Sequence, residues 1–318
     1  MTGSARNDSA RNDSAGNDSP MTGSDPMAAD GPSCSAWVRL GPVDFARTFS
    51  LQRLGPHDPT ARLSRDAFCK AFVYRGAPVT LAFQREPEEP EALRVTALGP
   101  TAEPLLAETL ACLAQEDDYA RFRTADSGVE RLHRSLPGLR LLRIPWLWDM
   151  ACSVILQQRI RTVDAMRTWS RMAAQWGAVA PLGLRTFPDA AGLAAIPEFA
   201  LRGLDVDAQR TGTLRRLARE WRFRPLRTEM SFAAMREELR RLPGIGPWTV
   251  ESILGYGAGD CDAAIPGDLH LPHLVCYALA GEIPGSDERM MELLEPFRGH
   301  RFRIIRLLYA SRLVVPRR

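Results

Sequence analysis

The sequence predicts an α+β protein in which a small domain of strands and one helix precedes a larger, all-helical domain. Two β-rich segments, AFCKAFVYRG (67–76) and APVTLAFQR (77–85), follow one another in the first part, and a helical segment, PLLAETLACLAQ (104–115), comes after them. From residue 128 onward the strand signals stop, and apolar residues recur at helical spacing. These observations place the change of fold type near residue 128.

The first 33 residues repeat a polar unit, as in ARNDSARNDSAGNDSP, and offer almost nothing to bury. Such a segment cannot recover the conformational entropy that folding costs, so we predict a disordered tail over residues 1–33. The rest of the chain divides into an α+β domain at residues 34–127 and a helical domain at residues 128–318.

The helical domain consists of apolar-periodic segments separated by breaks rich in Pro, Gly and Asp, such as FPDAAG and IPGD. The segments are WDMACSVILQQ (148–158), VDAMRTWSRMAAQWG (163–177), DAQRTGTLRRLAREW (207–221), SFAAMREELRRL (231–242), HLVCYALAG (273–281) and FRIIRLLYASRL (302–313). The third is basic and amphipathic, which suits either a surface near a polyanion or an ordinary solvated face.

The composition is that of a globular protein, with 318 residues, 45% hydrophobic, 25% charged and a net charge of +3. No apolar run reaches the length of a membrane span, and the polar N-terminus has no signal-peptide core. The six cysteines are scattered without a C-x-x-C pair, so we expect buried thiols in a reducing compartment. Lys70 is the only lysine, and arginine therefore supplies nearly all of the positive charge.

The segment LPGIGPWTV (242–250) predicts a short turn between two helices. Ser231 is a suitable N-cap for the first helix, and Pro247 suits the first position of the second. Gly244 and Gly246 allow positive φ and leave the amides of the turn uncovered, so that a phosphate can approach them and the positive end of the second helix. The alternative is an ordinary tight connection in which the glycines serve only packing.

Three segments together resemble the helix-hairpin-helix superfamily of DNA base-excision glycosylases. They are the hairpin LPGIG (242–246), the loop AIPGD (264–268) that ends in Asp268 at about the family's spacing, and ILQQR (155–159). The last of these is similar to a segment of the 3-methyladenine DNA glycosylase II branch. The resemblance implies a TATA-binding-protein-like N-terminal domain followed by the helical glycosylase (HhH-GPD) domain.

The resemblance implies that Asp268 is the catalytic carboxylate. Breaking the C1′–N bond passes through a transition state like an oxocarbenium cation, which a fixed negative charge beside the sugar stabilises. Whether Asp268 also orients a water molecule stays open. An aspartate at this place, after Pro-Gly and before a helical segment, is also an ideal helix N-cap, and both roles are compatible.

The resemblance also assigns residues that bind DNA. By position in the motif, Arg159 is the wedge that fills the gap left by an extruded nucleotide, with Gln158 beside it. The hairpin contributes Leu242, Gly244, Ile245, Gly246 and Thr249 to the strand contact. For Arg159 the alternative is a surface arginine at a helix end.

Trp248 and Leu269 stand where the resembling branch has residues of the base pocket. An electron-rich ring attracts a cationic alkylated purine through cation–π stacking. The alternative for Trp248 is a core residue at the hairpin. Leu269 stands where that branch has an aromatic side chain in the base pocket. Because this chain departs from the pattern there, the sequence defines the substrate less well than the fold.

The residues indicate a monofunctional enzyme without cofactors. Lyase members of the superfamily carry a lysine where this chain has Trp248, and no lysine follows Lys70. No cysteine follows Cys276, which excludes the C-terminal iron–sulfur cluster of other members, whereas a monovalent cation at the hairpin stays compatible. His270, His273 and Cys276 lack a convincing fourth ligand, so we predict no metal site.

The leading hypothesis is a glycosylase that flips out alkylated purines such as 3-methyladenine from double-stranded DNA and leaves an abasic site. The alternatives are a glycosylase for uracil, hypoxanthine or oxidised guanine, and a DNA-damage-binding protein without catalysis. We expect a monomer in the bacterial cytosol or nucleoid, with no membrane partner.

Overall fold

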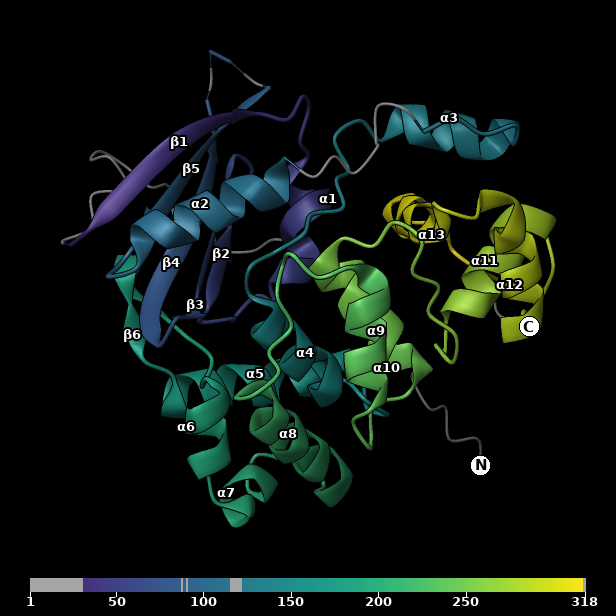
Figure 1. The fold of residues 1–318 in the computed structure, drawn as a ribbon. Helices are drawn as coiled ribbons and strands as arrows, with labels where there is room; N and C mark the ends of the chain where they lie inside the picture. Colours follow the sequence, from purple (N-terminus) through teal and green to yellow (C-terminus); the bar gives the residue numbers. More distant parts are fainter. Residues whose placement is uncertain (1–30, 87, 90, 115–121, 317–318) are drawn as a thin grey trace, which may run out of the picture.

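The computed structural model describes residues 31–86, 88–89, 91–114 and 122–316. In these residues a twisted sheet lies beside a larger body of helices (Figure 1). None of the described helices combines the length and the apolar character that crossing a membrane requires. Residues 1–30 of the predicted tail lie outside the described residues. The predicted end of the tail at residue 33 is wrong, because Ser33 already begins strand β1.

The sheet has five strands in the order β1-β5-β4-β3-β2, and all neighbouring strands are antiparallel. The strands are β1 (Ser33–Arg39), β2 (Ala61–Leu63), β3 (Ala67–Tyr74), β4 (Ala77–Arg85) and β5 (Ala92–Leu98). The two β-rich segments of the sequence form β3 and β4, and Arg75 and Gly76 join them with positive φ angles. Helix α2 (Ala102–Leu113) packs against β1 and β5 (Figure 1).

The remaining helices are short and surround a common core. They are α1 (Phe45–Phe49), α3 (Ser127–Ser135), α4 (Leu147–Leu156), α5 (Thr162–Trp176), α6 (Ala190–Ala195), α7 (Glu198–Arg202), α8 (Ala208–Trp221), α9 (Phe232–Arg240), α10 (Pro247–Ile253), α11 (Leu271–Ala280), α12 (Asp287–Leu294) and α13 (Arg301–Ala310). A 3₁₀ turn (Ser50–Gln52) extends α1, and a π-helical segment (Leu254–Ala258) extends α10.

The expectation of an all-helical second part is wrong at one place. Strands β6 (Val179–Ala180) and β7 (Leu184–Arg185) form a small antiparallel hairpin. Ala180 and Leu184 pack with Ala71 of β3, so this hairpin lies against β3 and β4 of the five-stranded sheet. Strands of two residues are too short to show the alternation by which a strand is recognised in sequence.

Aromatic side chains of the sheet pack directly against the helical part. Phe68 and Phe72 of β3 have ring centroids 6.2 Å and 5.5 Å from that of Trp146, the residue before α4. Phe49 of α1 stacks on Phe68 at 4.5 Å. One hydrophobic core therefore runs through both parts of the described chain.

Lys70 joins the two parts through a buried ion pair. Its Nζ lies 3.1 Å from Oδ2 of Asp149 on α4 and donates a 2.6 Å hydrogen bond to Thr60. Nζ also lies 5.0 Å from the ring of Trp169. Lys70 is only 2% exposed. Burial raises the pKa of Asp149 to about 6 although Lys70 acts to lower it, so the carboxylate is still charged at neutral pH.

We predict that Lys70→Met lowers the free energy of unfolding at neutral pH by about 3–5 kcal/mol, because it leaves the Asp149 carboxylate buried without a counter-charge. The folded-state pKa of Asp149 then rises further above its unfolded value. Protonation restores stability below that pKa, so the loss is larger at pH 8 than at pH 5. Urea unfolding at both pH values measures the difference.

The double variant Lys70→Met, Asp149→Leu is the control for this prediction. It removes both charges, so we expect it to recover most of the stability that the single variant loses. An equal loss at both pH values, with no recovery in the double variant, would contradict the buried ion pair as the cause.

Candidate active site

The segment 242–250 forms the predicted connection between two helices. The Ser231 hydroxyl accepts a hydrogen bond from the Ala234 amide at 3.2 Å and caps α9, and Pro247 opens α10, both as expected. Gly244 has a φ of +94°. Gly246 has φ −93° and ψ −180°, so it does not use the positive φ that a glycine allows. Any residue can adopt the extended backbone of Gly246, and a different reason must account for its glycine.

The space around the two glycines differs. A Cβ on Gly244 would lie 2.2 Å from Thr213 Oγ1 of α8, so close packing excludes a side chain there. A Cβ on Gly246 would meet nothing within 4 Å. Within the described chain, no hydrogen bond occupies the amides of Gly244 and Gly246. The turn thus presents free N–H groups on an open side, as an anion site requires.

Asp268 uses its two carboxylate oxygens differently. Oδ1 accepts hydrogen bonds of 2.9 Å from the amides of both His270 and Leu271 at the start of α11. Oδ2 accepts a 3.2 Å hydrogen bond from Trp248 Nε1. The N-cap position of α11 is His270, so the prediction of Asp268 as the N-cap residue is wrong by two residues. Its Oδ1 still accepts from the first amides of the helix, and these bonds orient the carboxylate without occupying Oδ2.

A cleft of about 1540 Å³ contains Asp268 and extends from the hairpin to the sheet. Trp248 lines this cleft and is half-buried. It packs against the core from the edge, whereas the alternative for this residue was a position inside the core. Arg47 of α1 and Gln52 of the following turn line the far side. The Gln52 amide is held by a 2.7 Å hydrogen bond to the Tyr256 carbonyl oxygen and by a 3.0 Å hydrogen bond from Trp146 Nε1. Both parts of the chain therefore form the cleft.

The cleft is also lined by three large side chains that no sequence motif indicated, namely Tyr256, Arg306 and Tyr309. One signal was present for Tyr256. Trp248, Ser252 and Tyr256 recur every four residues, which places them on one face of a helix. Arg306 and Tyr309 share a face of α13 in the same way, but nothing local in the sequence connects α13 with the hairpin.

The ILQQR segment meets the hairpin at the end of α4. Gln158 Nε2 donates hydrogen bonds to the Gly244 carbonyl oxygen (3.0 Å) and to Thr249 Oγ1 (2.8 Å). Arg159 is exposed, lines the cleft and has a φ of +58°. A left-handed backbone is costly for arginine, and such strain is concentrated at functional sites.

The other predicted site residues differ in what they offer to a ligand. Leu269 lies at the cleft with 76% of its surface exposed. Ile245 and Thr249 are buried, so their side chains hold the hairpin against the core. Leu242 is half-buried beside them. The exposed positions of this turn are the two glycines with Pro243 and Pro247, so its backbone is open to a strand contact.

The group of His270, His273 and Cys276 does not gather around a common point for a metal. His273 Nδ1 accepts a 3.0 Å hydrogen bond from the Gly285 amide. Among the described residues, no group of three or more His, Cys, Asp or Glu side chains is arranged to hold a metal ion.

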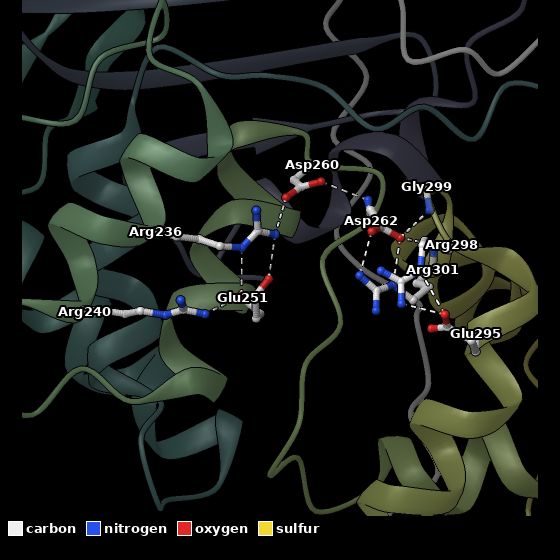
Figure 2. Close-up of polar contacts among 9 residues, drawn as sticks. All are labelled: Arg236, Arg240, Glu251, Asp260, Asp262, Glu295, Arg298, Gly299 and Arg301. Carbon is white, nitrogen blue, oxygen red and sulfur yellow. Dashed lines mark hydrogen bonds and ion pairs between the residues drawn. The ribbon is translucent and has the colours of Figure 1, made fainter.

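A charged network fixes the hairpin relative to the loop that carries Asp268 (Figure 2). Arg236 of α9 donates two parallel hydrogen bonds of 2.9 Å to Glu251 of α10 and also pairs with Asp260 in the following loop. Hydrogen bonds from Arg236 to Glu251 are the largest of the effects that raise the pKa of Arg236. A forked guanidinium contact of this kind restricts both distance and orientation.

The same loop is tied to α13 through Asp262 (Figure 2). Asp262 Oδ1 accepts hydrogen bonds from the Gly299 amide (2.7 Å) and from Arg301 Nε (2.8 Å). Burial acts to raise the pKa of Asp262, but these hydrogen bonds hold it below its usual value. The loop is thus fixed at both the hairpin and α13 before it reaches Asp268.

The described chain has the fold of DNA glycosylases of known structure. It is similar to the 3-methyladenine DNA glycosylase from Archaeoglobus fulgidus, with 20% identity, a TM-score of 0.72, and coverage of 87% of this chain and 99% of that chain. An 8-oxoguanine glycosylase/lyase from Clostridium acetobutylicum, in complex with double-stranded DNA, matches with 13% identity, a TM-score of 0.64 and coverage of 89% and 97%.

A third similar structure is the Schizosaccharomyces pombe 3-methyladenine DNA glycosylase in complex with abasic DNA. It has 16% identity and a TM-score of 0.53, and the match covers 64% of this chain and all of that one. No protein-family model and no curated protein sequence matches the chain. The glycosylase resemblance inferred from the hairpin, Asp268 and ILQQR is confirmed at the level of the fold.

The two glycines of the turn give a testable contrast. We predict that Gly244→Ala destabilises the protein by about 1–3 kcal/mol, because its Cβ meets Thr213 and its φ is positive. Gly246→Ala keeps the stability of the wild type but weakens binding of duplex DNA by about tenfold, because the methyl group stands where a phosphate would reach the amide. Thermal melting and fluorescence anisotropy measure the two effects. Unchanged DNA affinity of Gly246→Ala would remove the turn from the DNA interface.

Proposed function

We propose that this protein is a DNA glycosylase that hydrolyses the N-glycosidic bond of a damaged base in duplex DNA. The observation that carries the proposal is the arrangement of Asp268. Its Oδ1 is fixed by two amides while its Oδ2 lies in a cleft beside Trp248. The shared fold and the free amides at the hairpin turn support the same function.

The chemistry needs a negative charge that does not move during the reaction. As the C1′–N bond breaks, positive charge develops on the sugar, and a preorganised carboxylate stabilises it without reorganising. The cap of α11 holds the Asp268 side chain in one orientation, and the contacts of Arg236 and Asp262 hold its loop. The free amides of the hairpin can bind a phosphate of the DNA strand that carries the damaged base.

The absence of a nucleophilic amine supports hydrolysis without a lyase step. Trp248 stands where the lyase members of the superfamily carry a lysine. Lys70, the only lysine of the sequence, is buried in its ion pair with Asp149. Lys70 borders the cleft at the sheet, but it is 2% exposed and its ammonium is paired with Asp149, so no free lysine is available for a Schiff base with the sugar. The proposed product is therefore an intact abasic site.

Alkylated purines are the substrates that best fit a site with one catalytic carboxylate. A base that already carries a positive charge leaves readily, and the half-buried ring of Trp248 offers a face for cation–π stacking. A neutral lesion such as hypoxanthine is the second candidate. It is favoured by Arg306, a positive charge in the same cleft that would repel a cationic base. We propose a monomer acting on double-stranded DNA.

We predict that Asp268→Asn abolishes excision while the protein stays folded. Asparagine keeps an oxygen that can cap α11, but it removes the charge that stabilises the sugar cation. The single-turnover rate of base release from methylated DNA should fall by about 100-fold or more, with binding of that DNA retained. Asp268→Ala also loses the cap, so it should in addition lower stability by about 1 kcal/mol. A protein that only binds damaged DNA would be unaffected by Asp268→Asn.

We predict that Arg159→Gly has opposite effects on stability and activity. Glycine relieves the left-handed backbone, so the free energy of unfolding should stay equal or rise by up to about 1 kcal/mol. Excision should slow, because the side chain that would fill the emptied base position is gone. Arg159→Lys keeps the positive charge but replaces the planar guanidinium, so it separates the effect of filling the emptied base position from the effect of charge. If Arg159→Gly excises as fast as the wild type, Arg159 is a surface residue and not a wedge.

A further inference from the structure

Arg306 is a buried arginine whose charge has no carboxylate partner within the described chain. It is 7% exposed, and its Nη2 donates a 2.8 Å hydrogen bond to the Arg47 carbonyl oxygen. Arg301 on the same helix is instead paired with Asp262. Burial lowers the pKa of Arg306, but a guanidinium in a protein keeps its proton. The cleft therefore contains a fixed positive charge.

Such a charge is costly to bury unless its donors find acceptors. A guanidinium has five N–H donors, and the hydrogen bond to the Arg47 carbonyl oxygen uses one of its nitrogens. Arg306 lines the same cleft as Asp268. A ligand that brings an acceptor to this end of the cleft would compensate the cost.

Two tyrosines, Tyr256 and Tyr309, line the cleft that Asp268 and Arg306 share. Burial raises the pKa of Tyr256 to about 12, and both Arg306 and Asp268 act on it electrostatically. Burial also raises the pKa of Tyr309, which responds to the same two charges. A base whose sugar lies at Asp268 can thus extend along these rings toward the guanidinium.

The edge of the base that reaches Arg306 must accept hydrogen bonds, because a guanidinium only donates. A purine with a carbonyl oxygen at position 6 offers O6 and N7, the acceptor pair that arginine recognises in guanine. A purine with an amino group at position 6 would place N–H against N–H. The chemistry at this end of the cleft therefore discriminates between 6-oxopurines and 6-aminopurines.

We propose that Arg306 is a specificity-determining residue that raises the release of neutral 6-oxopurines, such as hypoxanthine, relative to that of 6-aminopurines, such as 3-methyladenine. This inference rests on the proposed glycosylase function of the same cleft. It names the residue through which the cleft would accept the second candidate substrate, hypoxanthine.

The test uses one DNA preparation that contains both bases. Duplex DNA that contains deoxyinosine and is then treated with dimethyl sulfate carries hypoxanthine and 3-methyladenine, and mass spectrometry quantifies each free base over time. For Arg306→Met we expect the ratio of the two release rates, hypoxanthine to 3-methyladenine, to fall by about tenfold or more relative to the wild type. Because both rates come from the same sample, the ratio does not depend on how much of the variant is folded.

Two further variants sharpen the result. Arg306→Lys keeps the positive charge but loses the forked pair of guanidinium donors. Its ratio of release rates should therefore lie between those of the wild type and Arg306→Met. Arg298→Met removes an exposed arginine that pairs with Glu295 outside the cleft, and its ratio should equal that of the wild type. An unchanged ratio in Arg306→Met, with both bases released, would overturn the role of Arg306 alone. Release of neither base by the wild type would overturn the proposed function and this inference together.

Discussion

The contact of Arg236 with Glu251 and Asp260 is the constraint on which the candidate site depends. It joins the helix before the glycine turn, the helix after it, and the loop that continues toward Asp268. The turn and the carboxylate are separated by α10 and its π-helical extension, so their relative position is not set by local backbone geometry. A forked, partly buried guanidinium contact fixes that position more strictly than hydrophobic packing alone, since it requires orientation as well as proximity.

The charges of the cleft lie at different places and have different consequences. Asp268 is held by backbone amides at the start of α11, and a negative charge at that place favours a sugar that becomes positive. Arg306 is held by a backbone carbonyl of α1, and a positive charge there favours the acceptor edge of a base. Tyr256 and Tyr309 line the same cleft, and burial raises the pKa of both hydroxyls, so they stay neutral beside these two charges.

The sheet is part of the site and does more than stabilise the helices. Residues of α1 and of the turn after it line the cleft, and they are held there because Phe49 stacks on Phe68 of β3. The ion pair of Lys70 with Asp149 connects the same strand with α4, the helix that ends in Gln158 and Arg159. A change at the sheet therefore reaches the cleft through β3 and α4.

The sequence by itself determined the local features. Ser231 caps α9 and Pro247 starts α10 as their residue types predict, and the β3–β4 hairpin follows from two adjacent β-rich segments, because these signals act over a few residues. Only the tertiary structure decided that Tyr256 and Arg306 share a cleft with Asp268, that the backbone of Gly246 is extended, and that Lys70 forms a buried ion pair with Asp149. Each of these depends on contacts between residues far apart in the chain, which local periodicity and turn chemistry do not encode.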